Sequence, residues 1–391
     1  MGIMDNDRIV VLYVFHEARL SGGATYSGIN MLKSLDFNKI KPIVVIPDKG
    51  NVEDVLMKMG IKTIVAPINL YFKGHVKSNY FVRIVFFLWK LLAFIKNLIL
   101  DCLYVKRSLK KEHIDIVHSN TSGILAGYVL SMFFNCKHIW HLREFIDKDF
   151  HEEPYLGFKF MRKIINSADA TISISGIIRK HWISPLRSNS YQVYNAVKSI
   201  DDVKPIVYSK EKFFLFCANR IEAFKGAMWA VEAFGKSNLF DDGYKMIFLG
   251  TCSCQLKNKL LDKAREYKAE KSIDFLGYSS DPSEYFAKAS AFLMCSDFEA
   301  MGRTTVEAFW YGCPVLGRNT GGTPELVKDG VTGYLFNSID ELAVLMKNIV
   351  NEEIIGMVEN AQAFAIDNFT EEKYGQKIES IYESVIPNYN E

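Results

Sequence analysis

The sequence predicts an α/β protein built from two doubly wound domains, each with a parallel sheet. The chain has 391 residues, and domains of roughly 150 residues make two the expected number. Short apolar runs alternate with helical stretches along the whole chain, as in parallel sheets with helices on both faces. This alternation restarts after the polar stretch Ser199–Pro205, where we place the domain boundary.

The predicted strands of the first half are apolar runs of strand length. They are Arg8–Phe15, Pro42–Ile46, Thr63–Ala66, Ile114–His118, Ala170–Ile174 and Tyr191–Tyr194. Between them, amphipathic or glycine-bounded stretches such as Gly23–Leu35 and Ser122–Phe134 are typical of crossover helices. Right-handed crossovers bring the carboxyl ends of parallel strands to one edge of the sheet, so functional loops are expected there.

The second half repeats this pattern. Its predicted strands are Lys212–Ala218, Lys245–Leu249, Ser272–Leu276, Ala291–Cys295 and Pro314–Leu316, and its predicted helices include Ala227–Phe234 and Arg303–Tyr311. The last segment, Glu371–Val385, has a helical pattern but is too polar to found a third domain. We therefore expect domains at 1–199 and 200–370.

Composition narrows the functional classes. With 49% apolar and 24% charged residues the chain is globular, and a net charge of +2 gives no support to nucleic-acid binding. Seven cysteines form no CxxC pair, so neither a disulfide scaffold nor a zinc site is expected. The polar segment Met1–Arg8 and the strand-length run Ile9–Phe15 do not form a signal peptide. A reduced cytoplasmic protein is the expectation.

The apolar segment 81–105 is long enough to cross a bilayer, but charged residues interrupt it. The interrupting residues are Arg83, Lys90, Lys96 and Asp101. This pattern favours an amphipathic helix over a membrane span. A basic cluster of Lys106, Arg107, Lys110 and Lys111 follows. Two interpretations stay open: segment 81–111 contacts anionic headgroups at a membrane surface, or 81–105 is a buried helix with a solvated end.

The segment 296–325 carries the most residues suited to ligand binding or catalysis. A predicted strand ends at Cys295, a loop carries Glu299, and a helix follows from near Gly302 to Gly312. The first turn of such a helix offers free backbone N–H groups beside Glu299 to an anion or a polyhydroxyl ligand. A carboxylate at Glu299 can accept hydrogen bonds from sugar hydroxyls. The alternatives are an exposed loop acid at Glu299 and a solvated helix carboxylate at Glu307.

A second signal lies at 217–226. Arg220 is predicted just beyond its strand, and Lys225 at the start of the next helix. A lysine at a helix N-terminus opposes the helix dipole unless an anion joins it. Two cations at the edge of a parallel sheet suit a diphosphate, with a guanidinium fork and an ammonium point charge. The alternative is a pair of ordinary surface cations.

Two weaker signals lie in the first half. Gly22 and Gly23, between the first strand and the first helix, permit close approach of a phosphate to the backbone. His141 is predicted to follow a short apolar strand, and His118 is placed similarly. A histidine at a strand end is also compatible with a purely structural role.

Taken together, these residues resemble the retaining glycosyltransferases of family 4. Glu299 and Glu307 enclose seven residues, as in the E-x7-E motif of that family. Further motifs follow in family order, namely Arg220 with Lys225–Gly226, Asn195–Val197, FLGY at 275–278, GGTPELVKDGVTGYLF at 321–336 and DIVHSN at 115–120. The resemblance is strong over 213–336 and loose over 1–200.

This resemblance implies a GT-B fold, in which two Rossmann-like domains face one another across a cleft. Residues 1–199 would form the acceptor-side domain, with the C-terminal helix at about 371–391 packing back on it. Residues 200–370 would hold the nucleotide-sugar donor. The resemblance implies no metal and no other cofactor, because basic side chains take the place of the metal.

The resemblance also assigns roles by position. Arg220 and Lys225 would stabilise the leaving diphosphate, Glu299 would hold donor-sugar hydroxyls, and His141 would lie near the transferred sugar. The remaining donor-binding positions are Gly22 and Gly23 at the diphosphate, Gly277 and Tyr278 at the base, Glu307 at the ribose, and the backbone of Ala300, Met301 and Gly302 at the sugar. Retention would proceed by front-side attack, so neither glutamate acts as a nucleophile as one would in a retaining glycosidase.

The expected function is therefore transfer of a hexosyl or N-acetylhexosaminyl group from a nucleotide-sugar to a glycan or undecaprenyl-linked glycan. By family analogy the setting is surface polysaccharide assembly at the inner face of the membrane. The alternative is a non-catalytic or partner-dependent subunit that binds a sugar-nucleotide. A GT-B phosphorylase or an epimerase would not require an acceptor. A nicotinamide dehydrogenase is excluded because a GxGxxG motif followed by an acid is absent.

Overall fold

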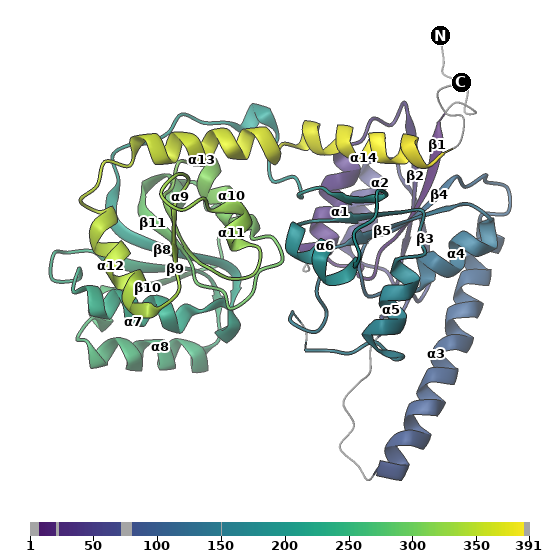
Figure 1. Cartoon of the computed structure of the whole chain (residues 1–391), viewed down its shortest axis with the longest axis horizontal. Coiled ribbons are helices and arrows are strands. Elements are labelled where there is room, and N and C mark those ends of the chain that lie inside the picture. The colour runs from purple at the N-terminus through teal and green to yellow at the C-terminus, as the bar shows by residue number, and fades with distance from the viewer. Residues whose placement is uncertain (1–7, 21–22, 72–79, 150, 387–391) are drawn as a thin grey trace. The chain divides into compact units, whose positions relative to one another are not determined.

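The computed structural model describes residues 8–20, 23–71, 80–149 and 151–386, with side chains from 87 onward in the helix that begins at Tyr80. The chain divides into two compact units (Figure 1). Unit 1 comprises Met1–Ala196 together with Glu371–Glu391, and unit 2 comprises Val197–Thr370. The boundary predicted after Ser199 lies just beyond the division after Ala196, and the C-terminal helix belongs to unit 1.

Unit 1 is built on a seven-stranded parallel sheet with the order β3-β2-β1-β4-β5-β6-β7. Its strands are β1 (Ile9–Val14), β2 (Ile40–Ile46), β3 (Lys62–Val65), β4 (Ile116–Ser119), β5 (Lys137–Leu142), β6 (Ala170–Ser173) and β7 (Ser190–Gln192). Its helices are α1 (Gly23–Lys33), α2 (Asn51–Lys58), α3 (Tyr80–Ser108), α4 (Ala126–Phe134), α5 (Gly157–Ile165), α6 (Gly176–Trp182) and α14 (Glu371–Val385). The strand order reverses between β1 and β4, and in such sheets ligands bind beyond the carboxyl ends at this switch point.

Unit 2 is built on a six-stranded parallel sheet with the order β10-β9-β8-β11-β12-β13. Its strands are β8 (Glu211–Ile221), β9 (Lys245–Cys252), β10 (Ile273–Gly277), β11 (Ala289–Met294), β12 (Val315–Arg318) and β13 (Tyr334–Phe336). Its α-helices are α7 (Ala227–Ser237), α8 (Cys254–Glu266), α9 (Ser283–Lys288), α10 (Arg303–Trp310), α11 (Thr323–Leu326), α12 (Ile339–Ile349) and α13 (Ile355–Asn368). Here the switch point lies between β8 and β11. The α/β class with two Rossmann-like sheets is confirmed.

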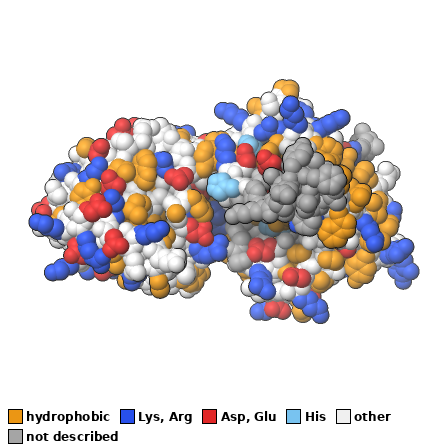
Figure 2. All heavy atoms as spheres, turned by 90° about the horizontal axis from the view of Figure 1, so that it is seen from below, with side chains coloured by type: hydrophobic (Ala, Val, Ile, Leu, Met, Phe, Trp, Pro, Cys, Tyr) orange, Lys and Arg blue, Asp and Glu red, His pale blue; other side chains and the backbone are white. Residues whose placement is uncertain are grey.

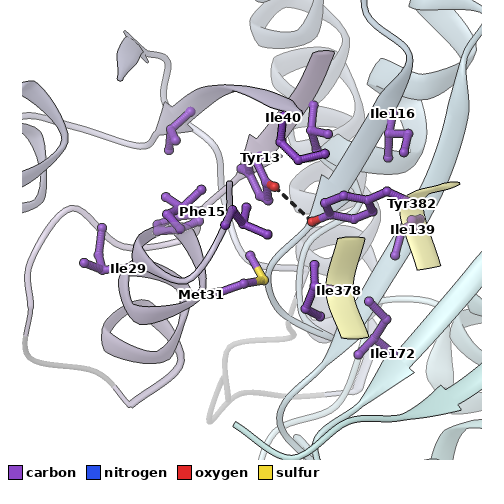
Figure 3. Close-up of a cluster of buried hydrophobic side chains, with 14 of the residues drawn as sticks. Tyr13, Phe15, Ile29, Met31, Ile40, Ile116, Ile139, Ile172, Ile378 and Tyr382 are labelled. Atoms are coloured by element: carbon purple, nitrogen blue, oxygen red, sulfur yellow. Dashed lines mark hydrogen bonds between the residues drawn. The ribbon is translucent and has the colours of Figure 1, made fainter. Parts of the chain in front are cut away.

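Helix α14 belongs to the core of unit 1 although its sequence is largely polar. Tyr374, Ile378 and Tyr382 are buried with side chains of β1 and α1, because they recur at helical spacing on one face (Figure 3). The Tyr382 hydroxyl reaches the hydroxyl of Tyr13 at 2.9 Å. One apolar stripe is therefore enough to fix this helix against the sheet.

Four strands differ from the sequence-based prediction. β8 continues to Ile221, beyond the predicted end at Ala218, because it stays paired with β9 at Arg220 and Thr251. His141 was expected after its strand but lies within β5, and His118 lies within β4. The three-residue strand β13 was not predicted, since so short a run carries no periodic signal.

Helix α3 is only partly covered by the rest of unit 1. Phe94, Cys102 and Val105 are buried, whereas apolar side chains between Leu88 and Leu100 are exposed. The interpretation of 81–105 as a buried helix is therefore wrong for this part, because the helix extends away from the sheet and only one side of it is packed (Figure 1). Within the described residues, no helix is long and apolar enough to cross a bilayer.

Candidate active site

The predicted catalytic residues of unit 2 lie at the carboxyl edge of its sheet, around the β8/β11 switch point. Arg220 is the next-to-last residue of β8, Lys225 ends the 3-10 turn Ala223–Lys225 that follows, and Glu299 lies in the loop after β11. Residues of two strands that neighbour each other in the sheet but not in the sequence are thus brought together. This is the location where doubly wound sheets bind ligands.

Lys225 and Glu299 form the tightest contact at this edge. Lys225 Nζ lies 2.6 Å from Glu299 Oε1, and the hydroxyl of Ser296 donates to the same oxygen at 2.7 Å. Both charged side chains are largely covered, so the pair is less screened than a surface ion pair. The sequence predicted that Lys225 needs an anion at this helix start, and in the free chain Glu299 supplies that negative charge.

Gly321 and Gly226 pack closely against the backbone of the segment that leads from β11 to Glu299. Gly321 has φ of 59°, and a Cβ there would lie 2.6 Å from the backbone nitrogen of Glu299. The next residue, Gly322, donates its N–H to the carbonyl of Glu299 at 2.7 Å. On the other side of the switch point, Gly226 has φ of 76°, and a Cβ would approach the carbonyl oxygen of Cys295 to 1.9 Å. Glycine is required at both places because of positive φ and because of close packing.

Arg220 does not take part in the Lys225–Glu299 pair. Its guanidinium Nη2 lies 3.4 Å from Glu222 Oε1, and three quarters of its side chain is exposed. It was predicted just beyond the strand end and lies instead within the extended β8, on the same edge as Lys225. This exposed guanidinium remains available to an anion, since a surface ion pair of this kind contributes little free energy.

Glu307 lies further along α10 and is half-buried, so the alternative of a solvated helix carboxylate does not describe it. Burial raises the pKa of its carboxyl, against the lowering effect of the Arg303 and Lys198 charges. Burial also raises the pKa of the Cys217 thiol to about 12, with a further contribution from the Glu307 charge. Glu307 is therefore a covered acceptor next to β8.

The other predicted donor-binding positions of unit 2 lie around this centre. Gly277 ends β10 with φ of 79°, and the Tyr278 side chain after it is exposed. Gly302 caps α10 with φ of 92°, while Met301 is buried, so that only its backbone is a plausible ligand contact. Among the described residues, no group of three His, Cys, Asp or Glu side chains is arranged to hold a metal ion.

Sequence reasoning missed Arg318, which forms an ion pair with Asp297. The Arg318 guanidinium carbon lies 3.9 Å above the ring of Trp229, a distance typical of a cation–π contact. Thr320 Oγ1 donates to the carbonyl of Asp297 at 3.1 Å. These contacts hold the loop between β11 and α10 from the β12 side. A signal was present, since Arg318 ends the strand that precedes the GGTPE motif.

In unit 1, the predicted Gly23 lies at the switch point between β1 and β4, and the predicted His141 lies on the next strand, β5. Gly23 begins α1, where a Cβ would meet no atom within 4 Å, and Gly22 lies outside the described residues. The Asn120 amide, after β4, donates to the carbonyl of Ala24 at 3.1 Å. This bond spans the β1/β4 switch point and connects the start of α1 with the end of β4.

His141 lies on the neighbouring strand β5 and is fully buried. Its Nδ1 lies 3.2 Å from His118 Nε2 and 3.4 Å from an Arg143 nitrogen, Nη2. Burial holds the pKa of both imidazoles well below the usual value, and the Arg143 charge adds to this effect. Both histidines are therefore neutral at pH 7.

Arg143 is the second functional residue that sequence reasoning missed. It is 3% exposed, and its guanidinium donates to the side-chain oxygen of Asn120 from Nε at 3.1 Å and from Nη2 at 2.9 Å. A further nitrogen donates to the Asn195 oxygen. Its position two residues after His141 in HLRE was the available signal. The carboxyl edge of unit 1 thus carries a buried cation held by amide oxygens.

The fold places this protein in the class of α/β proteins with two Rossmann-like units. At the carboxyl edge of each sheet, polar and charged groups lie near the switch point, where such proteins bind nucleotides and sugars. The family model "Glycosyltransferase Family 4" matches residues 22–199, and "Glycosyl transferases group 1" matches residues 199–380. The chain belongs to this glycosyltransferase family and has the GT-B fold, as the resemblance of the motifs indicated.

Similar proteins agree with this assignment. The α-1,3/1,6-mannosyltransferase ALG2 of Dictyostelium discoideum is 30% identical over 46% of this chain and 47% of its own length. The chain thus matches about half of that relative. The capsular polysaccharide biosynthesis glycosyltransferase CapH of Staphylococcus aureus is 25% identical over 61% of this chain and 68% of its own. The structure of Anabaena HepE with UDP-glucose superposes with a TM-score of 0.71 at 19% identity, covering 96% and 100% of the two chains.

Proposed function

We propose that this protein is a retaining, metal-independent glycosyltransferase that moves a hexosyl or N-acetylhexosaminyl group from a nucleotide-sugar to a glycan or undecaprenyl-linked glycan. The observation that carries the proposal is the Lys225–Glu299 pair at the switch point of unit 2. It places a cation suited to a diphosphate 2.6 Å from a carboxylate suited to sugar hydroxyls. The relationship to CapH supports a place in surface polysaccharide assembly at the inner face of the membrane.

In this proposal the bond between the anomeric carbon and the diphosphate oxygen breaks, and the acceptor oxygen bonds to that carbon on the same face. The acceptor proton passes to the departing phosphate. Arg220 and Lys225 stabilise the charge that develops on the diphosphate, which is the largest contribution we expect. Glu299 orients the sugar, Glu307 accepts from the ribose, and the Gly277–Tyr278 backbone contacts the base. His141, Gly22 and Gly23 contribute from unit 1.

A thermal-shift screen against UDP-, GDP-, ADP- and dTDP-sugars identifies the donor, because a bound ligand raises Tm by mass action. UDP-glucose is the first probe, given the bound ligand in HepE. The responding donor is then incubated with glycan and undecaprenyl-linked acceptors. Release of nucleoside diphosphate that requires an acceptor supports a transferase. Donor binding without turnover supports the alternative, a sugar-nucleotide-binding subunit, and turnover without an acceptor supports a phosphorylase or an epimerase.

We further propose that α3 rests on an anionic membrane surface. Leu88, Leu92, Ile95 and Ile99 recur at intervals of four, three and four residues and are all exposed, so they form one apolar stripe. Figure 2 shows hydrophobic side chains gathered on unit 1 with Lys and Arg side chains near them. Beyond the stripe the exposed residues Arg107, Lys110 and Lys111 continue the surface with positive charge. An apolar stripe followed by basic residues is typical of helices that lie in the headgroup region.

Sedimentation with liposomes tests this surface. We expect binding to phosphatidylglycerol liposomes at low salt, weaker binding at high salt, and little binding to phosphatidylcholine alone. Leu92→Glu should weaken it several-fold, because a carboxylate replaces an apolar contact and repels anionic lipid. Leu186→Glu is the matched control, since Leu186 is an exposed leucine of unit 1 outside α3. No sedimentation with anionic liposomes at low salt would contradict the proposal.

A further inference from the structure

A chain of buried hydrogen bonds runs from α14 to His141. The hydroxyls of Tyr13 and Tyr382 lie 2.9 Å apart (Figure 3). The Tyr382 hydroxyl also lies 2.8 Å from His118 Nδ1. His118 Nε2 lies 3.2 Å from His141 Nδ1. All four side chains are fully buried. The C-terminal helix therefore reaches the His141 imidazole on β5 through two polar contacts, from Tyr382 to His118 and from His118 to His141.

Arg143 settles the direction of every bond in this chain. A guanidinium can only donate, so His141 Nδ1, 3.4 Å from Arg143 Nη2, must be the lone-pair nitrogen. His118 Nε2 faces the same lone pair and therefore carries a proton. In a neutral imidazole the other nitrogen then accepts, so the Tyr382 hydroxyl donates to His118 Nδ1 and accepts from Tyr13.

This assignment also determines the state of the other ring nitrogen of His141, Nε2. With Nδ1 as acceptor, the neutral ring carries its proton on Nε2. This nitrogen is buried and has no hydrogen-bond partner among the described residues. A buried donor without an acceptor costs free energy, so such a group in a native protein needs an explanation. A ligand oxygen would satisfy it.

We infer that Arg143, His118 and Tyr382 are positioning residues that hold His141 as a neutral Nε2–H donor to an oxygen of the donor sugar. This inference rests on the proposed function, because the ligand is the nucleotide-sugar of that reaction. His141 then acts by directed hydrogen bonding and not as a general acid or base. Tyr382 gives the C-terminal helix a role in the site, in addition to packing.

The tautomer is measured directly by long-range ¹H–¹⁵N correlation on the full chain labelled at histidine, with His141→Asn and His118→Asn to assign the signals. We expect both rings as neutral Nε2–H tautomers at pH 7. A proton on Nδ1 of His141 would overturn the inference. This measurement uses no substrate, so it is independent of whether the proposed transfer reaction is found.

The ligand is tested by adding the nucleotide-sugar that raises Tm in the screen, with the matching nucleoside diphosphate as the comparison. We expect the His141 Nε2–H signal to shift with the nucleotide-sugar and to stay in place with the diphosphate alone. An unchanged signal in the presence of bound nucleotide-sugar would overturn the role of His141 as donor to the sugar.

Tyr382→Phe tests the positioning role, since it keeps the ring and removes only the hydroxyl. We expect kcat/KM for the nucleotide-sugar to fall about tenfold, with Kd for the nucleoside diphosphate unchanged, because His118 Nδ1 loses its donor and its ring no longer holds His141 firmly in place. The matched control is Tyr374→Phe, a buried tyrosine of the same helix outside this chain. Identical kcat/KM in the two variants would overturn the positioning role.

A second variant covers the case in which Tyr382→Phe does not fold. Tyr13→Phe removes the last hydroxyl of the chain and leaves the Tyr382 hydroxyl on His118. We expect both tautomers and kcat/KM to stay within twofold of the wild type, because His118 keeps its donor. A Tyr13→Phe protein with a changed His141 tautomer would contradict the direction assigned to the chain.

Discussion

Lys225 and Glu299 form an ion pair of 2.6 Å across the β8/β11 switch point of unit 2. They are 74 residues apart in the sequence, and only the parallel order of the sheet brings them together. Without a ligand, each of these side chains neutralises the charge of the other. In the proposed reaction Lys225 also binds the diphosphate and Glu299 the sugar. The ion pair therefore keeps both side chains in position, but it competes with the ligand for them.

Lys225→Met should lower kcat by roughly 100-fold or more, because removing one group that stabilises transition-state charge typically has an effect of this size. The measurement is the initial rate of nucleoside diphosphate release with donor and acceptor. Lys236→Met is the control, since Lys236 forms a comparable ion pair with Asp340 on the surface of the same unit. A Lys225→Met enzyme with unchanged kcat would rule out a role at the leaving group.

Gly321→Ala should abolish donor binding while leaving unit 2 folded. Its positive φ costs a side chain roughly 1 kcal/mol, and its Cβ would additionally collide with the Glu299 backbone at 2.6 Å. The loop must then move and carry the Glu299 carboxylate with it. Donor affinity by calorimetry and the unfolding transition are both measured.

Gly330→Ala separates the cost of a positive φ from the effect of a collision with the Glu299 backbone. Gly330 also has a positive φ, of 71°, but a Cβ there meets no atom within 4 Å. It should lose a similar amount of stability from the backbone and bind the donor normally. Equal donor affinity in the two variants would show that the position of the Glu299 loop does not matter.

The sequence was informative where a local pattern coincides with a physical requirement. Apolar runs located most strands, because a buried parallel strand needs continuous apolar residues. The motif around Glu299 predicted the loop on which the proposed site is built, and the family resemblance identified the fold. Arg220 shows the limit, since the length of β8 is set by its pairing with β9 and not by its own residues.

The partners of the site residues could not be predicted. The Arg143 network joins Asn120 and Asn195, from two other strand ends, and these contacts exist only after the sheet has formed. The same is true of Tyr382, whose hydroxyl reaches His118 from a helix 264 residues away. A single sequence carries no signal for contacts of this range, whereas it carries a clear one for the periodicity of each element.

Glu144 gives unit 1 a pH-dependent stability that the sequence does not reveal. Its carboxylate accepts from Thr121 Oγ1 at 2.9 Å and from the Ser122 N–H at 3.1 Å, yet burial raises its pKa to about 7. In the unfolded chain the pKa is close to the ordinary value near 4.5. Between these two values Glu144 binds more protons in the folded state than in the unfolded state, so its contribution to stability falls as pH rises.

We therefore expect Glu144→Gln to gain stability relative to the wild type as pH rises from 5 to 8, because only the wild type loses the contribution of this carboxyl. The buried histidines, whose lowered pKa values have the opposite effect on stability, contribute equally to both proteins. The glutamine keeps one oxygen to accept the bonds from Thr121 and Ser122 but cannot ionise. Urea unfolding at several pH values measures this. The control is Glu112→Gln, because Lys62 and Lys41 hold the pKa of Glu112 below its usual value. Its contribution is lost only as pH falls below the ordinary carboxyl range, so that variant should retain the wild-type dependence of stability on pH between pH 5 and 8. A Glu144→Gln protein with the same dependence on pH as Glu112→Gln would place the titrating group elsewhere.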